Sequence, residues 1–344
     1  MKHLFYIHST VTYFVALEVI KYKKLDKHAC CLLLGRGFKQ LYKFSEIKQS
    51  IVPFSHHLFD SFAVEKQLWN GWRKLRAFDD YVAQITNSDS FHLYTNQSGT
   101  SFIQLFISHR KCSGFSFLEE GMASFYPISK INNEICPAGY ATSFYKLLKH
   151  LNYFGRLSQN PYFYDEGYDK VYGISEAAFP EFRNKIILDN PFYNSEASNC
   201  INGHLIALDA LYEYGIVEKA VYVQAIEKMF LYFQKRKVDQ IYIKYHPEQY
   251  NNATHLQEIR NVVTRYKRGI KVIELSSTCS LELIAGNNLA DINFYVFLSS
   301  VGLYAGMCGK KANSFATYIG EKDIQFKEKI ESLPSVFSKY VKFL

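Results

Sequence analysis

Two adjacent carboxylates, Glu119 and Glu120, directly follow the apolar run 114–118 and precede Gly121. Adjacent carboxylates raise each other's pKa, and a carboxylate in a cleft can then act as a general base. An acidic loop before a turn glycine is the ordinary alternative. We take Glu119 as the candidate base, with Glu120 and Gly121 as supporting residues.

A histidine, His246, follows a second apolar run at 240–244 and precedes Pro247. Proline biases the residue before it toward an extended conformation, which fixes the direction in which the imidazole projects. An imidazolium at this position could bind or protonate a phosphate group. A lone histidine in a strand-to-loop turn is the commoner interpretation.

A pair of hydroxyls, Ser299 and Ser300, lies between the apolar run 292–298 and a predicted helix that ends near residue 307. Hydroxyls together with the backbone N–H groups of a helix N-terminus can bind an anion. A plain N-cap is the alternative, because serine serves that role in many helices.

A second acidic pair, Asp165 and Glu166 before Gly167, competes with the first. It follows no strand pattern, and a catalytic base should stand on a rigid strand end. We therefore prefer Glu119.

Several common motifs are absent from the sequence. There is no G-x-G-x-x-G and no Walker A sequence, so the sequence does not support a dinucleotide-binding site or a P-loop. No two aspartates stand two apart, so the D-x-D clamp for a divalent metal is missing. His56 and His57 form the only histidine pair, and no cysteine cluster accompanies them. A zinc site is therefore not expected.

The motifs must be positioned by alternating strands and helices. The pattern predicts strands at 4–7, 29–34, 91–94, 114–118, 185–188, 240–244, 271–275, 292–298 and 314–319, and helices at 10–21, 100–111, 217–237, 254–266 and 280–287. Such alternation is typical of parallel, doubly wound sheets. In these sheets ligands bind beyond the carboxyl ends of the strands, where all three motifs fall.

A chain of 344 residues is longer than a single domain with one hydrophobic core usually is. We therefore expect an α/β protein with two Rossmann-like domains that face a cleft. The predicted divisions are an N-terminal domain at 1–180, a C-terminal domain at 181–322 and an amphipathic helical tail at 323–344.

Composition narrows the class of protein further. Hydrophobic residues make up 48% and charged residues 21%, which indicates a folded chain. The net charge of +8 favours anionic partners, but the basic residues are spread along the chain, which argues against a nucleic-acid partner.

Seven cysteines without a C-x-x-C pair indicate free thiols in a reducing compartment. No apolar run approaches the roughly 18 residues that span a bilayer, so we expect a cytoplasmic protein, soluble or peripheral at the membrane.

In their order and topology, the E-E-G, H-P and S-S motifs resemble those of bacterial sialyltransferases with the glycosyltransferase-B fold. The resemblance covers about residues 114–126 and 240–306. It extends to Glu282 in the sequence SLELI, which is similar to a glutamate that contacts the cytidine ribose in those enzymes. This chain has glutamate at both acidic positions, where many relatives have aspartate. Which of Glu119 and Glu120 reaches the acceptor therefore stays open.

The resemblance implies a donor, CMP-sialic acid, and a single inverting displacement that requires no metal or other cofactor. It implies that Glu119 deprotonates the acceptor hydroxyl in the first domain, and that the second domain binds CMP. The implied CMP-binding residues are His246 (also the candidate general acid), Pro247, Glu282, Ser299 and Ser300. The acceptor would be a surface glycan that is lipid-linked: lipooligosaccharide, O-antigen or capsule. His8, Arg36 and Tyr94 lie near other strand ends and could line the acceptor site, although structural roles are equally consistent.

Other functions remain open. Transferases of another CMP-linked 2-keto sugar acid, such as Kdo, carry similar motifs. Sugar-nucleotide 2-epimerases share the two-domain fold but should bind UDP rather than CMP, and a non-catalytic glycan-binding protein would show no turnover. The tail, with Lys339 and Lys342 among apolar residues, could contact a membrane, although packing onto a domain is the default. The sequence does not indicate an oligomeric state.

Overall fold

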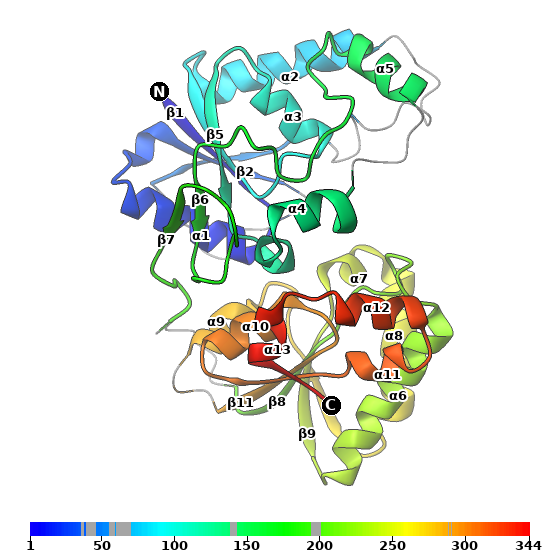
Figure 1. Cartoon of the computed structure of the whole chain (residues 1–344). Coiled ribbons are helices and arrows are strands. Elements are labelled where there is room, and N and C mark those ends of the chain that lie inside the picture. Colours follow the sequence, from blue (N-terminus) through cyan, green and yellow to red (C-terminus); the bar gives the residue numbers. More distant parts are fainter. Residues whose placement is uncertain are drawn as a thin grey trace. The chain divides into compact units, whose positions relative to one another are not determined.

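Each half of the chain builds its own parallel sheet (Figure 1). The computed structural model describes residues 1–35, 38, 46–54, 59, 70–137, 143–193, 201–287, 289 and 291–344. These fall into two compact units, Met1–Pro191 and Phe192–Leu344. The predicted α/β architecture of two Rossmann-like domains is confirmed.

The first unit contains a seven-stranded sheet in the order β3-β2-β1-β4-β5-β6-β7, with every neighbouring pair parallel. Its strands are β1 Lys2–Ile7, β2 Cys30–Leu34, β3 Lys48–Ile51, β4 Phe91–Thr95, β5 Cys112–Leu118, β6 Val171–Gly173 and β7 Lys185–Ile187. The central strands β1, β2 and β4 are buried over most of their length because helices cover both faces of the sheet.

Helices pack on the two faces of this sheet. They are α1 Thr10–Tyr22, α2 Gly71–Thr86, α3 Ser101–Ile107, α4 Ile128–Lys130 and α5 Ser143–Asn152, with short turns η1 Lys27–Ala29, η2 Gly121–Phe125 and η3 Ile131–Ile135. On one face Phe5 stacks on Tyr94, whose hydroxyl accepts a hydrogen bond from Lys23 at the end of α1. On the other face Tyr6 packs against Phe102 of α3, with ring centroids 5.7 Å apart.

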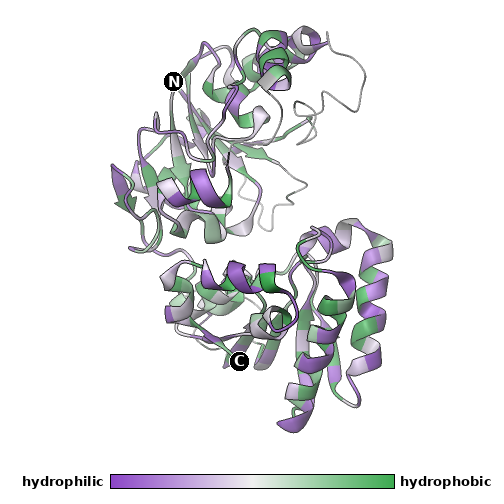
Figure 2. Ribbon diagram, turned by 45° about the vertical axis from the view of Figure 1, so that its right-hand side comes forward, coloured by the Kyte–Doolittle hydropathy of each residue, from purple (hydrophilic) through white to green (hydrophobic). Residues whose placement is uncertain are grey.

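The second unit repeats the design with six parallel strands in the order β10-β9-β8-β11-β12-β13. The strands are β8 Gly203–Ala207, β9 Gln240–Lys244, β10 Lys271–Glu274, β11 Ile292–Val296, β12 Lys311–Ser314 and β13 Val341–Phe343. The helices are α6 Lys219–Lys235, α7 Pro247–Asn251, α8 Ala253–Tyr266, α9 Leu281–Gly286, α10 Ser300–Met307, α11 Ala316–Gly320, α12 Ile324–Glu331 and α13 Ser335–Tyr340. Figure 2 shows hydrophobic residues on the strands and hydrophilic ones on the outer helix surfaces.

An aromatic cluster forms part of the second core. Phe233 of α6 is fully buried, and its ring lies 4.8 Å from that of Tyr295 on β11 and 6.0 Å from that of Phe315. Tyr295 and Phe315 are themselves stacked. The cluster fixes α6 on its face of the sheet.

The structure corrects three of the predictions about domains and elements. The domain division predicted at residue 180 moves to Pro191, because the run at 185–187 pairs with β6 as the edge strand of the first sheet. The segment 323–344 is no separate helical tail, since its last strand, β13, pairs with β12. Residues 314–319 were predicted to form a strand, but only Ser314 ends one, and Ala316–Gly320 is helical.

Two further findings concern membrane-spanning helices and the cysteines. No helix in the described ranges is both long and apolar enough to cross a membrane. The six cysteines within those ranges are free thiols.

Replacing Phe233 by alanine should lower the free energy of unfolding of the second unit by about 3–5 kcal/mol, because it removes a fully buried ring from a packed cluster. Leu231→Ala on the same helix is the control, since Leu231 is 36% exposed and should cost about 1 kcal/mol or less. Denaturant unfolding of both variants tests this, and equal losses would contradict the assigned core.

Candidate functional site

Both sheets have a point where the order of the strands reverses. It lies between β1 and β4 in the first unit and between β8 and β11 in the second. In sheets of this order, ligands bind in the crevice at that point, beyond the carboxyl ends of the strands. The residues that follow these four strands are therefore the first candidates for a site in each unit.

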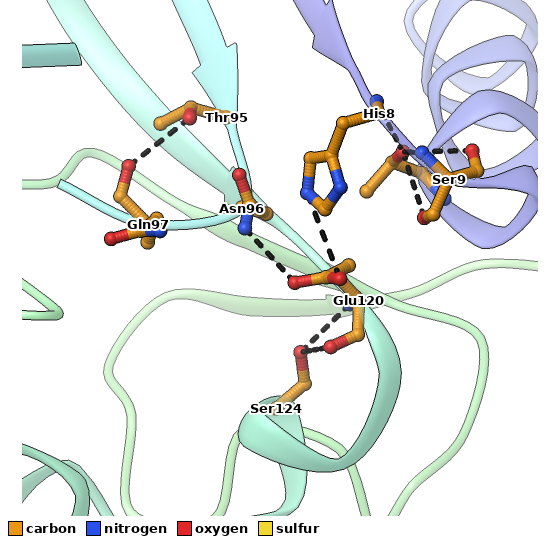
Figure 3. Close-up of polar contacts among 8 residues, drawn as sticks. His8, Ser9, Thr95, Asn96, Gln97, Glu120 and Ser124 are labelled. Atoms are coloured by element: carbon orange, nitrogen blue, oxygen red, sulfur yellow. Dashed lines mark hydrogen bonds and ion pairs between the residues drawn. The ribbon is translucent and has the colours of Figure 1, made fainter. Parts of the chain in front are cut away.

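In the first unit, Glu120 contacts residues from both sides of this point (Figure 3). Its Oε2 accepts a hydrogen bond from Nδ2 of Asn96, after β4, at 2.9 Å. Its Oε1 lies 3.6 Å from Nε2 of His8, after β1. The Glu120 side chain is 26% exposed, so a ligand can reach it. We call His8, Asn96 and Glu120 the first strand-end site.

Two buried atoms of this site have unused hydrogen-bonding capacity. Among the described residues, Nε2 of His8 and Oδ1 of Asn96 are buried without a hydrogen-bond partner. The His8–Glu120 separation is too long for a hydrogen bond. Leaving a buried polar atom unpaired costs about 1–3 kcal/mol, and such groups commonly mark positions that a ligand or water completes.

Glu119 points away from this site. Its side chain is fully buried, and Oε2 accepts a hydrogen bond from the backbone N–H of Ile174, after β6, at 2.7 Å. Consecutive residues at a strand end point to opposite sides, so one member of the acidic pair faces inward. Glu119, the base expected from the sequence, is therefore enclosed in this structure, and Glu120 is the member of the acidic pair that a ligand can reach.

Gly121 turns the chain back toward Glu120. Its φ of 54° lies in the left-handed region, which glycine adopts without steric cost. The turn η2 then brings Oγ of Ser124 within 2.8 Å of the Glu120 backbone N–H, which donates a hydrogen bond to it. The backbone at Glu120 is thereby fixed.

The other residues considered for this unit lie elsewhere. Oδ1 of Asp165 accepts the N–H of Gly167 in an exposed turn. Tyr94, the penultimate residue of β4, is buried, and its hydroxyl points away from this site toward Lys23 and His3. Arg36 and the pair at 56–57 lie outside the described residues. Of the two additional acceptor candidates that the structure describes, His8 joins the first strand-end site and Tyr94 does not.

In the second unit, His246 caps helix α7. Its Nδ1 accepts the N–H of Glu248 at 3.1 Å, and Pro247 occupies the first helical position, which suits its fixed φ. Burial lowers the pKa of His246, with Glu248 opposing and Lys244 adding to the effect. At neutral pH the ring is therefore neutral and carries its proton on Nε2.

Hydrogen bonds fix the residues around His246 and around Asp209, after β8. The His246 N–H donates to Oε1 of buried Gln249 at 2.9 Å. The Tyr222 hydroxyl donates to the carbonyl of Asp209 at 2.8 Å. Gln249 also donates to Oε1 of Glu213, at 2.9 Å.

Asp209 then binds the turn that contains the serine pair. Its Oδ2 accepts the N–H of Leu298 at 2.6 Å. Burial raises the pKa of Asp209 to about 6, although hydrogen bonding to the backbone of this turn opposes the shift. Ser299 is the N-cap of α10, and Ser300 is its first residue. We call Asp209, His246, Ser299 and Ser300 the second strand-end site.

Glu282 lies in the first turn of α9, where its Oε2 accepts a hydrogen bond from the hydroxyl of Ser280 at 3.0 Å. The ammonium of Lys244, at the end of β9, donates to the carbonyl of Cys279. Burial lowers the pKa of Lys244, while the Glu282 carboxylate raises it. Glu282 is thus half-buried near the end of the strand that precedes His246.

Sequence reasoning missed Asn96, Asp209, Gln249 and Ser124. Asn96 and Asp209 each follow a buried strand at the reversal point, and this position was the available indication. The sequence pattern also did not reveal β8 as a strand, which hid the position of Asp209.

A Ser–His–Asp arrangement occurs toward the amino ends of the first sheet. Nε2 of His92 lies 2.9 Å from Oγ of Ser116, and Nδ1 lies 3.5 Å from Oδ2 of Asp169. Ser116 is only 1% exposed, and burial lowers the pKa of His92 to about 4. An enclosed hydroxyl beside so weak a base does not make a nucleophile, so we regard the arrangement as structural.

Within the described ranges, no group of three or more His, Cys, Asp or Glu side chains could hold a metal ion.

Comparisons with known proteins identify the fold. No family model matches the chain, and no curated protein matches it. The UDP-GlcNAc 2-epimerase of Methanocaldococcus jannaschii, solved with UDP-GlcNAc and UDP, is similar over 100% of this chain and 89% of its own, with a TM-score of 0.52 and 14% identity. A UDP-N-acetylglucosamine 2-epimerase from Rickettsia bellii covers 91% of this chain and 78% of its own (TM-score 0.45, 13% identity). A glycosyltransferase from Rickettsia africae covers 99% and 94% (TM-score 0.42, 11% identity). The similarity to the Methanocaldococcus jannaschii structure, together with the two parallel sheets, shows a two-domain Rossmann-like fold of the glycosyltransferase-B type.

The buried Asp209 predicts a pH dependence of stability. The pKa of Asp209 is raised in the folded state, so folding favours its neutral form. The contribution of this group to the free energy of unfolding is therefore complete below about pH 4 and is lost as the pH rises through about 6. Asp209→Asn resembles the neutral form at every pH. The unfolding free energy of the wild type minus that of the variant should fall by about 2–3 kcal/mol between pH 4 and pH 7. A constant difference across this range would contradict the assignment.

Proposed function

We propose that the chain is an inverting sialyltransferase that moves sialic acid from CMP-sialic acid to a hydroxyl of a bacterial surface glycan. The observation that carries the proposal is the position of Glu120, a reachable carboxylate held between His8 and Asn96 at the carboxyl edge of the first sheet. The motif resemblance supplies the donor, and the H-P and S-S motifs lie at the corresponding edge of the second sheet.

Glu120 acts as the general base, in place of Glu119. It accepts the proton of the acceptor hydroxyl while the acceptor oxygen attacks the anomeric carbon and the bond to the CMP phosphate oxygen breaks. Asn96 holds one carboxylate oxygen by its hydrogen bond, which leaves the other, beside His8, for the acceptor. His8 and Asn96 thereby position the Glu120 carboxylate from the ends of β1 and β4.

The second strand-end site binds the leaving CMP. Its phosphate gains negative charge in the transition state, and the Nε2–H of neutral His246 and the hydroxyls of Ser299 and Ser300 donate hydrogen bonds to it. Each well-placed donor of this kind can lower the barrier by about 3 kcal/mol. Because His246 is neutral, it acts as a hydrogen-bond donor rather than as the general acid that the sequence allowed. Pro247 fixes its backbone, and Glu282 binds the ribose hydroxyls.

No metal or other cofactor takes part in this proposal. A single phosphate leaving group can be stabilised by these neutral donors. The glycan acceptor, such as lipooligosaccharide, O-antigen or capsule, follows from the resemblance. A donor that carries another 2-keto sugar acid, such as Kdo, would use the same groups.

The first test of this function replaces the base. Glu120→Gln should lower the turnover number by about 10²–10⁴ with CMP affinity retained, because it removes the proton acceptor and keeps the shape. Glu119→Gln should instead lower the unfolding free energy by about 1–3 kcal/mol, because it disturbs a buried hydrogen bond. Steady-state kinetics and thermal unfolding separate the two effects.

Glu166→Gln, in the exposed second acidic motif, is the matched control and should leave both quantities unchanged. Loss of turnover in the Glu119 or Glu166 variant, with activity intact in the Glu120 variant, would refute the assignment.

The second test concerns the nucleotide. CMP should bind and UDP should not, and Glu282→Ala should weaken CMP about ten- to hundredfold, because charged hydrogen bonds to the ribose contribute about 1.5–3 kcal/mol. Glu328→Ala, an exposed carboxylate on α12, is the control. Calorimetric titration measures all three proteins. Binding of UDP alone would favour an epimerase, and equal CMP affinities would remove Glu282 from the site.

A further inference from the structure

Helix α5 of the first unit exposes large apolar side chains along one side. Phe144 is 67% exposed, Leu147 42% and Leu151 61%, and their spacing of three and four residues places them on one face of the helix. Phe154, just after the helix, is 73% exposed. Contiguous exposed apolar side chains of this kind mark interaction sites on soluble domains.

The start of α2 extends this surface. The N–H of Gly71 donates to Oδ1 of Asn152, the last residue of α5, at 3.3 Å. A Cβ atom at Gly71 would lie 2.4 Å from the Asn152 carbonyl oxygen, so the two helix ends are in direct contact. Trp72 follows and is 47% exposed, with the guanidinium of Arg73 5.2 Å from its ring centroid. We call Trp72, Phe144, Leu147, Leu151 and Phe154 the apolar surface.

Positive charge predominates on the segments that carry the apolar surface. Residues 71–86 and 143–156 contain six Lys and Arg, against two Asp and no Glu. Arg73 and Arg76 are exposed on α2. Exposed apolar and tryptophan side chains beside cations are the features of elements that bind the surface of an anionic bilayer.

We propose that the apolar surface docks onto an anionic phospholipid bilayer. The apolar side chains enter the boundary between headgroups and acyl chains, and Arg73 and Arg76 pair with lipid phosphates. A second copy of this chain is a poorer occupant, because a two-fold contact would bring two surfaces of the same net positive charge together.

The C-terminal stretch, for which the sequence left membrane contact open, packs onto the second unit, as expected by default. Val341 is 1% exposed, and its strand, β13, belongs to the second sheet. The proposal does not depend on the nucleotide chemistry. If the proposed function is correct, docking would bring the first strand-end site to the bilayer that holds a lipid-linked acceptor.

Sedimentation with vesicles of phosphatidylcholine, with and without phosphatidylglycerol, tests the proposal. The wild type should bind vesicles that contain phosphatidylglycerol and bind phosphatidylcholine alone at least about tenfold more weakly. Phe144→Ser combined with Leu151→Ser should reduce binding by about 30-fold, because less apolar area is buried. Arg73→Gln combined with Arg76→Gln should reduce it by about tenfold or more and weaken its dependence on salt.

The matched control is Leu231→Ser combined with Ile324→Ser, which replaces two exposed apolar residues of the second unit. It should bind as the wild type does, and circular dichroism should show all variants folded. Equal loss in the control and α5 variants, no binding by the wild type, or a dimer that the α5 variant dissociates would overturn the proposal. Turnover of CMP-sialic acid without vesicle binding would refute docking alone, and vesicle binding without turnover would refute the proposed function alone.

Discussion

In each unit, one buried carboxylate holds the carboxyl edge of the sheet in place. Glu119 binds the N–H of Ile174, and Asp209 binds the N–H of Leu298. A carboxylate removed from water is strongly destabilising unless hydrogen bonds compensate it. The loop after the neighbouring strand must therefore keep its conformation for the fold to remain stable. The same constraint fixes the residues beside these carboxylates, Glu120 in the first unit and Ser299 in the second.

This constraint gives adjacent residues different roles. Glu119 and Glu120 have the same side chain, but the sheet encloses the first and leaves the second in reach of a ligand. In the second unit, Asp209 after β8 accepts the N–H of Leu298 after β11, and His246 after β9 is held by Gln249. The ends of β8 and β11 are thus connected by a hydrogen bond, and a ligand at one end would meet groups whose positions depend on the other.

The fold class, and the placement of the three motifs at the ends of strands, could be predicted from the sequence. Short apolar runs of strand length alternate there with longer amphipathic segments of helix length. The sequence could not decide which glutamate faces outward, since that depends on how the chain leaves β5 and turns at Gly121. The edge strand β7 was placed in the wrong unit, because an isolated apolar run carries no information about its partner. Asn96 and Asp209 were missed for a similar reason: a single polar residue after a strand gains meaning only when the order of strands is known.

The division at Pro191 has a genetic consequence, because each sheet and its helices come from one uninterrupted stretch of sequence. A recombination event near codon 191 would exchange one complete set of strands and leave every hydrogen bond of the other sheet intact. The two halves of the gene are therefore free to be inherited from different parents. In lineages where such exchange has occurred, phylogenetic trees drawn from the two halves would disagree, and each half would keep its own ancestry.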